Sequence, residues 1–335
     1  MLRRLSILQN SITDWKFKAL LQLTFSLMPR GEQLNYLVQR SMGSLPASDA
    51  AFGGTVSYAK RHIDAIRRYY NRSLANATFY EFGAGWDMVI PLAFYGFGVG
   101  SQILVDIRNL IRVSLLNDTI DKYQRMGSDL AIPRIPAARL NCRKHNITTV
   151  FKTHYGIDYR APCDPKQTGL TARSIDCITS TSTLEHIPRG DISPILRECH
   201  RILRDDGLMS ALINYDDHYS YFDTKVSGYN FLQYSDRMWA IFNPALHYQN
   251  RLRHRDYLDL IQAAGFDVVE DQHKEMTETD LKTLEQLSLN ARFRNYSSGE
   301  LAVHNALLIL RKRPTKNNET SGNQIPNPRP TNWAV

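Results

Sequence analysis

Hydrophobic and polar positions follow two different periods along the chain, and the change falls near residue 75. Before that point, apolar residues recur at helical spacing over 15–27 and again over 58–70. A helix returns to the same face every three to four residues, so this spacing indicates helices with one buried side. We therefore predict an N-terminal helical region over residues 1–75.

Beyond residue 75, short apolar runs alternate with amphipathic helices. The strands are predicted at 78–82, 102–106, 157–160, 175–180, 208–214, 266–270 and 306–310. Such alternation is typical of a parallel sheet covered by helices on both faces. The pattern predicts a doubly wound α/β domain over residues 76–312, with a seven-stranded and mostly parallel sheet. The Asn- and Pro-rich residues 313–335 have little to bury, and we expect them to be disordered.

One connection is unusually long. Residues 214–253 separate the fifth strand from the next helix and are rich in aromatic residues and histidine. Long connections in compact domains usually carry function, and ligands bind at the carboxyl ends of such strands. We expect a cap insertion here, with Tyr221, Tyr229 and Trp239 as candidate walls of an acceptor pocket. The alternative is that these aromatic residues form the core of the cap.

Charge and composition narrow the class of protein. The chain has 335 residues and a formal net charge of +8, but the basic residues are scattered except near the two ends. Without a basic stripe, nucleic acid is a disfavoured partner. The uncharged run 88–105 is long enough to cross a bilayer, yet Pro91 and several glycines interrupt it. We predict a cytoplasmic protein, with peripheral membrane contact of the N-terminal helices and the oligomeric state left open.

The cysteines do not indicate a metal or a disulfide framework. The chain has four, with no C-x-x-C pair and no histidine at zinc-finger spacing. Reduced thiols in a cytosolic protein are the simplest interpretation. On this reasoning we expect no metal site.

Glycines directly follow the first strand and precede a helix. Gly83 and Gly85 permit a tight turn and close approach of a nucleotide-like ligand. Asp87 comes next, and we predict it as the N-cap of the following helix. A carboxylate there disfavours a dinucleotide, whose pyrophosphate occupies the start of that helix. S-adenosylmethionine has no phosphate and carries a sulfonium and an ammonium, so it tolerates acids at this position.

Asp106 ends the second strand. An acid at that point, about 20 residues beyond the glycines, holds the ribose hydroxyls of a nucleotide. Its alternative function is to cap the segment that begins at Arg108.

With these residues the chain resembles the class I S-adenosylmethionine-dependent methyltransferases, in particular the bacterial type-11-like group with a Leu-Glu-His-Ile motif, here residues 184–187. The resemblance implies a Rossmann-like methyltransferase fold and S-adenosylmethionine as cofactor. It also implies which residues bind the cofactor. Ser180, in the fourth predicted strand, lies at the rim of the crevice formed at the carboxyl ends of the strands. The implied contacts are Glu81, Gly83, Ala84 and Gly85 for the methionine part, Asp106 for the ribose, and Asp164 beside Cys163 for adenine.

Methyl transfer to an alcohol or phenol needs in-line alignment and loss of a proton. His218 is the favoured base, with Asp216 or Asp217 to orient it. His186 is a second candidate, and its alternative is a loop histidine bonded to a backbone carbonyl or to Glu185. We expect a small-molecule, sugar or lipid-linked acceptor, with O-methylation preferred. The competing hypothesis is a non-catalytic methyltransferase-like binding or scaffold protein, which would carry a degraded cofactor motif.

Overall fold

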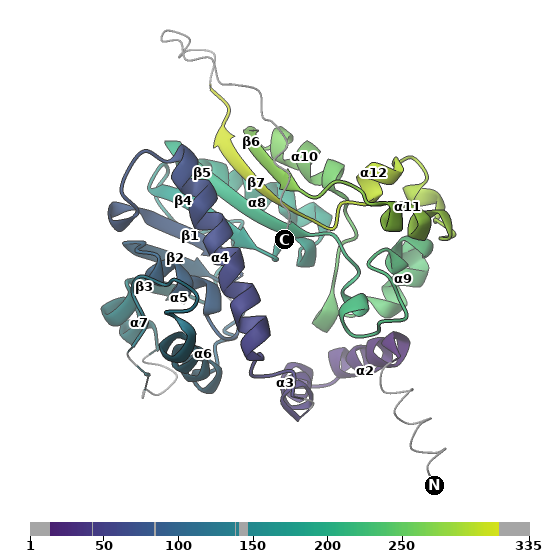
Figure 1. Cartoon of the computed structure of the whole chain (residues 1–335), viewed down its shortest axis with the longest axis horizontal. Coiled ribbons are helices and arrows are strands. Elements are labelled where there is room, and N and C mark those ends of the chain that lie inside the picture. Colours follow the sequence, from purple (N-terminus) through teal and green to yellow (C-terminus); the bar gives the residue numbers. More distant parts are fainter. Residues whose placement is uncertain (1–13, 42, 84, 138, 141–146, 315–335) are drawn as a thin grey trace.

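A computed structural model describes residues 14–41, 43–83, 85–137, 139–140 and 147–314. Its centre is a seven-stranded sheet with strand order β3-β2-β1-β4-β5-β7-β6 (Figure 1). The strands are β1 Thr78–Phe82, β2 Ser101–Val105, β3 Ile157–Arg160, β4 Ile175–Thr181, β5 Leu203–Asn214, β6 Phe266–His273 and β7 Asn305–Lys312. β7 is antiparallel to both of its neighbours, and the remaining pairs are parallel. The predicted doubly wound, mostly parallel sheet is confirmed.

Two hydrophobic clusters fill the two faces of this sheet. One includes residues of the helices α4 Asp49–Tyr69, α5 Val89–Gly96, α6 Val113–Met126 and α7 Ile147–Tyr155. The other includes residues of α8 Arg189–Ile202 and α10 His254–Ala263. The carboxyl ends of β1, β2 and β4 therefore come together at one edge between the two layers, which is where ligands of such sheets bind.

The long helix α4 is part of the sheet's cover. Its residues Phe52, Val56, Ile63 and Ile66 are almost fully buried, in the same cluster as Phe79 of β1. The change of hydrophobic period at residue 75 therefore does not coincide with a break in packing. Between residues 14 and 48 the structure describes two helices, α2 Trp15–Leu27 and α3 Gly31–Ser41, which lie below the sheet in the view of Figure 1.

The connection between β5 and α10 folds into short helices. They are η4 His218–Tyr221, η5 Asn230–Gln233, α9 Asp236–Phe242 and η6 Ala245–His247. Tyr229 and Trp239 belong to a hydrophobic cluster that also contains Trp15 of α2. Tyr221, in contrast, is 63% exposed. Tyr229 and Trp239 are therefore core residues, as the alternative interpretation states.

The remaining elements complete the fold around this sheet. They are η1 Leu74–Asn76, η3 Leu184–His186, α11 Glu278–Glu285, η7 Ala291–Phe293 and α12 Ser298–Leu301. Among the described residues, no helix is long and apolar enough to cross a membrane.

Candidate active site

The glycine loop after β1 adopts backbone angles that favour glycine. Gly83 has φ +83° and Gly85 has φ +72°. A Cβ atom added to Gly83 would lie 2.5 Å from the Cγ2 atom of Thr183, which follows β4. A side chain here would therefore be strained by its backbone angle and would also collide with the neighbouring loop. Ala84 lies outside the described residues.

The helix after the loop begins one residue later than expected. Met88, with φ +61°, is the N-cap of α5 and makes no side-chain capping bond. The prediction that Asp87 is the N-cap is wrong in that respect, because the left-handed Met88 turns the chain once more before the helix starts. The Asp87 carboxylate still accepts from the Val89 backbone N–H at 3.4 Å. Burial raises the pKa of Asp87.

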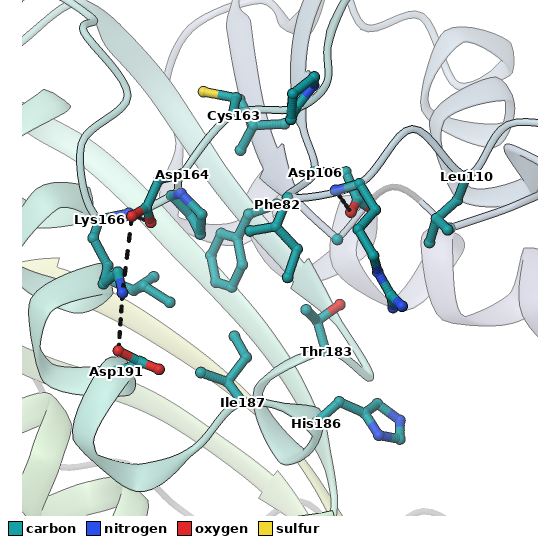
Figure 2. Close-up of a pocket in the computed structure, with 18 of the residues that line it drawn as sticks. Phe82, Asp106, Leu110, Cys163, Asp164, Lys166, Thr183, His186, Ile187 and Asp191 are labelled. Carbon is teal, nitrogen blue, oxygen red and sulfur yellow. Dashed lines mark hydrogen bonds and ion pairs between the residues drawn. The ribbon is translucent and has the colours of Figure 1, made fainter. Parts of the chain in front are cut away.

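A cleft of about 660 Å³ opens at the carboxyl ends of β1, β2 and β4. This volume is in the range of small-molecule sites. Figure 2 shows Phe82, Asp106, Cys163, Asp164 and Thr183 around it. Of the residues predicted to bind the cofactor, the cleft is lined by Gly83, Gly85, Asp106 and Asp164.

Asp106 makes the local capping bond and also lines the cleft. Its carboxylate accepts from the Arg108 backbone N–H at 2.9 Å, which is the local capping bond. The same side chain lines the cleft and is only 7% exposed. Burial raises its pKa, and the backbone N–H groups of Arg108 and Gly85 oppose the rise. The turn thus holds the carboxylate at the cleft, and ribose binding by Asp106 stays a prediction.

Asp164 lies at the outer rim of the cleft in an ion-pair chain. Its carboxylate accepts from the Lys166 backbone N–H at 2.9 Å. The Lys166 ammonium lies 3.8 Å from Asp164 and 3.0 Å from Asp191 of α8 (Figure 2). All three side chains are substantially exposed, so these pairs contribute little to stability. They instead order the loop beside the cleft.

Two predicted residues, Glu81 and Ser180, are not among those lining the cleft. Both are buried in the strands beneath it. The Thr181 hydroxyl donates to Glu81 Oε1 at 3.0 Å, and burial raises the pKa of Glu81 to about 7. Ser180 Oγ has no hydrogen-bond partner among the described residues. An assignment of Ser180 to the cofactor thus stays a prediction.

A buried histidine that the sequence did not single out supports Glu81. His62 of α4 is fully buried; its Nδ1 lies 2.7 Å from Ser210 Oγ and its Nε2 lies 3.3 Å from Thr181 Oγ1. Because Thr181 donates to Glu81, the consistent arrangement is Ser210 to His62, His62 to Thr181 and Thr181 to Glu81. Burial lowers the pKa of His62 to about 3, so its ring is neutral. Helix α4 thereby fixes an acid under the glycine loop.

Three histidines form a row that starts at the cleft. His186 lines the cleft, and its ring centroid lies 5.0 Å from that of His218. His247 follows, with its centroid 6.3 Å from His218. We call His186, His218 and His247 the histidine row. Sequence analysis identified His186 and His218 as candidates but not His247, because nothing in the local sequence around His247 distinguishes it.

The rings of the histidine row are neutral. Burial and the neighbouring histidines lower the pKa of His218 to about 3, and burial also lowers that of His247 to about 3. The surrounding protein lowers the pKa of His186 as well, although part of its ring is open to solvent. The His186 Nδ1–H donates to the Tyr248 carbonyl oxygen at 2.8 Å, which leaves the lone pair on Nε2. This is the backbone contact that the alternative interpretation of His186 named.

The two acids expected to orient His218 have other partners. The Asp217 carboxylate accepts from the Tyr219 backbone N–H and the Asn230 amide. The Asp216 carboxylate lies 2.6 Å from His304 Nδ1. The prediction that Asp216 or Asp217 orients His218 is therefore wrong, because Asp217 bonds within the 215–253 segment and Asp216 pairs with His304.

Two further cavities continue from the cleft toward the N-terminal helices. The first, of about 350 Å³, shares Gly85 and Arg108 with the cleft. The second, of about 310 Å³, shares Asn35, Gln39 and Leu246 with the first. This second cavity is mostly apolar, and its wall includes Phe17, Leu21, Phe25, Val38, Phe222 and His247. The three cavities are thus neighbours, from the cleft at the glycine loop to the space lined by α2 and α3.

Comparison with known protein families gives a match over part of the chain. Residues 115–211, from α6 to β5, match the family model of a methyltransferase domain. No curated protein sequence matches the chain.

Many solved structures are similar to this chain. An S-adenosylmethionine-dependent methyltransferase from Methanosarcina mazei is 12% identical, with 74% of this chain and 97% of that chain covered and a TM-score of 0.43. The YcgJ protein from Bacillus subtilis is 15% identical, with 75% and 97% covered and a TM-score of 0.39. A geranyl diphosphate C-methyltransferase from Streptomyces coelicolor is 13% identical, with 76% and 80% covered and a TM-score of 0.40.

The family match and the sheet agree with the class expected from the glycine loop. The chain contains a methyltransferase domain, and S-adenosylmethionine is the methyl donor that the glycine loop predicts.

Proposed function

We propose that this S-adenosylmethionine-dependent methyltransferase transfers the methyl group to a hydroxyl oxygen of a small-molecule acceptor that has an apolar part. One observation carries the proposal. The cavities that share walls with the cofactor cleft continue past the glycine loop into an apolar space, and the histidine row leads to the same space. His186 lines the cleft at one end of the row, and His247 lines the apolar cavity at the other.

The size and lining of these cavities favour a small molecule over a macromolecule. The outer two measure about 350 and 310 Å³, and the last is walled by Phe17, Leu21 and Phe25 of α2. A pocket of this kind encloses most of a small ligand's surface, with a few polar groups to fix its orientation. Asn35 and Gln39 supply such groups on the shared wall.

The histidine row favours an oxygen nucleophile. Neutral imidazoles offer lone pairs to a hydroxyl proton. With a pKa of about 3, however, His218 is a weak proton acceptor at neutral pH, because a general base works best with a pKa near the working pH. We therefore assign His218 to the binding and positioning of the acceptor hydroxyl.

The test uses purified protein, S-adenosylmethionine labelled in its methyl group, and fractionated small molecules from cells. We expect label in a small apolar alcohol or phenol, with an O-methyl group identified by NMR. His218→Ala is expected to lower kcat/KM for that acceptor by about 100-fold, the scale of one positioned polar group. Its affinity for S-adenosylhomocysteine should not change, because His218 does not line the cofactor cleft.

His273→Ala is the matched control, since His273 lies on β6 and pairs with Asp271. It should leave both quantities unchanged. Label in protein or nucleic acid, or a methyl group on carbon or nitrogen, would contradict the proposal.

A further inference from the structure

Glu185 is the most unusual buried group near the cleft. It follows β4 in the short helix η3, is 1% exposed, and neither of its carboxylate oxygens has a hydrogen-bond partner among the described residues. Burying an unpaired carboxylate is costly, and such groups normally pair with a cation or coordinate a metal. The missing partner therefore needs an explanation.

The imidazoles of His186 and His218 lie beside that carboxylate. One ligand atom each of Glu185, His186 and His218 lies within 4.8 Å of the others. His218 Nε2 is also buried without a partner in the described part of the chain. His186 has the support that metal-binding histidines usually have, because its Nδ1–H donates to a backbone carbonyl and leaves Nε2 as the ligand atom.

We propose that Glu185, His186 and His218 bind a divalent transition-metal ion at the boundary between the cofactor cleft and the acceptor cavities. Two imidazoles and one carboxylate suit zinc, iron(II), cobalt(II) or manganese(II), whereas magnesium and calcium prefer oxygen ligands throughout. Ligands about 2.1 Å from a tetrahedral metal lie about 3.4 Å apart, so side-chain shifts of about an ångström close the site. His247, the third member of the row, has an unpartnered Nε2 as well.

A second group of the same residue types shows the contrast. His254, Asp271 and His273 also lie close enough to hold a metal. There, however, each carboxylate oxygen of Asp271 is already paired, with His254 Nε2 at 2.7 Å and with His273 Nδ1 at 2.8 Å. That group is satisfied without an ion and carries no proposal. It supplies the control for the first group.

The role of the metal rests on the proposed function, whereas its binding does not. In that role the lone pair of His218 binds the metal, and His218 positions the acceptor hydroxyl through the metal. A metal with open coordination positions lowers the pKa of a bound hydroxyl. The acceptor O–H bond would break with the proton passing to water. The oxygen would then form a bond to the methyl carbon as the carbon–sulfur bond breaks. The products are the methyl ether, S-adenosylhomocysteine and one proton, so no oxidant or further reactant is needed.

The test is metal binding by the tag-free, chelator-treated protein without cofactor or acceptor. Cobalt(II) is titrated and followed by its visible absorption, and zinc is titrated by calorimetry. We expect one equivalent to bind. Glu185→Gln and His218→Ala should each weaken binding by about 100-fold, since even residues that only orient a ligand change metal affinity by 10–100-fold. His273→Ala should bind cobalt as the unmodified protein does.

Two results would overturn the proposal: absence of cobalt binding, or binding that neither Glu185→Gln nor His218→Ala weakens. Circular dichroism of each variant confirms folding, and if one fails to fold the other decides. S-adenosylhomocysteine affinity is measured in parallel. Cofactor binding without metal binding contradicts this inference alone, and metal binding without cofactor binding contradicts the proposed function alone.

Discussion

The cofactor cleft and the histidine row are neighbours, yet they are built in different ways. The cleft is formed by loops that directly follow β1, β2 and β4, so its shape depends on backbone angles such as φ +83° at Gly83. The row is formed by side chains from η3, η4 and η6, which meet only through packing of the segment 215–253. The comparison indicates that binding of the methyl donor depends on backbone geometry. Recognition of the acceptor depends on side chains that can change without altering the sheet.

The largest effect on cofactor binding is expected from Asp106→Ala. The change removes the carboxylate held at the ribose position, and hydrogen bonds to a charged group are worth about 1.5–3 kcal/mol each. Affinity for S-adenosylhomocysteine, measured by calorimetry, should fall by at least about 100-fold. Asp164→Ala at the exposed rim is the control, with a loss of about 10-fold or less. Equal losses would contradict the distinction between the bottom and the rim of the cleft.

Gly83→Ala separates the two reasons for a glycine in the loop. The positive φ is expected to cost about 1–3 kcal/mol, and the collision with Thr183 adds a similar amount. The free energy of unfolding, measured with denaturant, should fall by both amounts.

In the double variant Gly83→Ala/Thr183→Ala, only the part due to the collision should be recovered. Gly169→Ala gives the contribution of backbone angle alone, since Gly169 has φ +69° and an added Cβ atom would meet nothing within 4 Å. A full recovery in the double variant would show that the backbone angle does not matter.

His62→Gln sharpens the comparison through pH. The folded pKa of His62, about 3, lies below its unfolded value of about 6.5. Between these pH values the unfolded chain binds a proton that the folded chain does not bind. The free energy of unfolding therefore decreases as pH falls through this window. The loss reaches about 1.4 kcal/mol per pH unit.

The variant should lack this part of the pH dependence, measured as unfolding free energy at pH 7 and pH 5. His154→Gln, at an exposed position of α7, should keep the dependence of the unmodified protein. The same slope for both variants would contradict the buried neutral state of His62.

The smallest effect tests the acceptor side alone. Leu246 stands on the wall shared by the two outer cavities, so Leu246→Trp should narrow the passage between them. We expect a rise of about 10-fold in KM for the acceptor, equal to about 1.4 kcal/mol, with unchanged affinity for S-adenosylhomocysteine. Ile241→Trp, at a position 51% exposed, is the control. A loss of cofactor affinity in Leu246→Trp would contradict the separation of the two regions.

The cofactor side was largely predictable because its signals are local. Gly83 and Gly85 stand next to the strand that places them, and Asp106 directly follows the next strand. The exception is Asp87, which was expected to cap α5 although Met88 does so in a left-handed conformation. Residue type alone does not predict such a conformation, because it is uncommon for any residue except glycine.

The acceptor side was only partly predictable. His186 and His218 were named, but the acids expected to serve His218 are held by Asn230 and His304 instead. Those partners lie 13 and 88 residues away along the chain. No local sequence pattern predicts which of several nearby groups will hydrogen-bond to an acidic side chain.

By itself the sequence determined the doubly wound sheet, the glycine loop and the acid at the end of the second strand. Hydrophobic period and the backbone needs of a tight turn act over a few residues, so they can be read along the chain. Tertiary structure decided that His62 supports Glu81 from α4, that Tyr229 and Trp239 are core, and that Glu185 lies unpaired beside two histidines. These relations join side chains distant in sequence, and only packing brings them together.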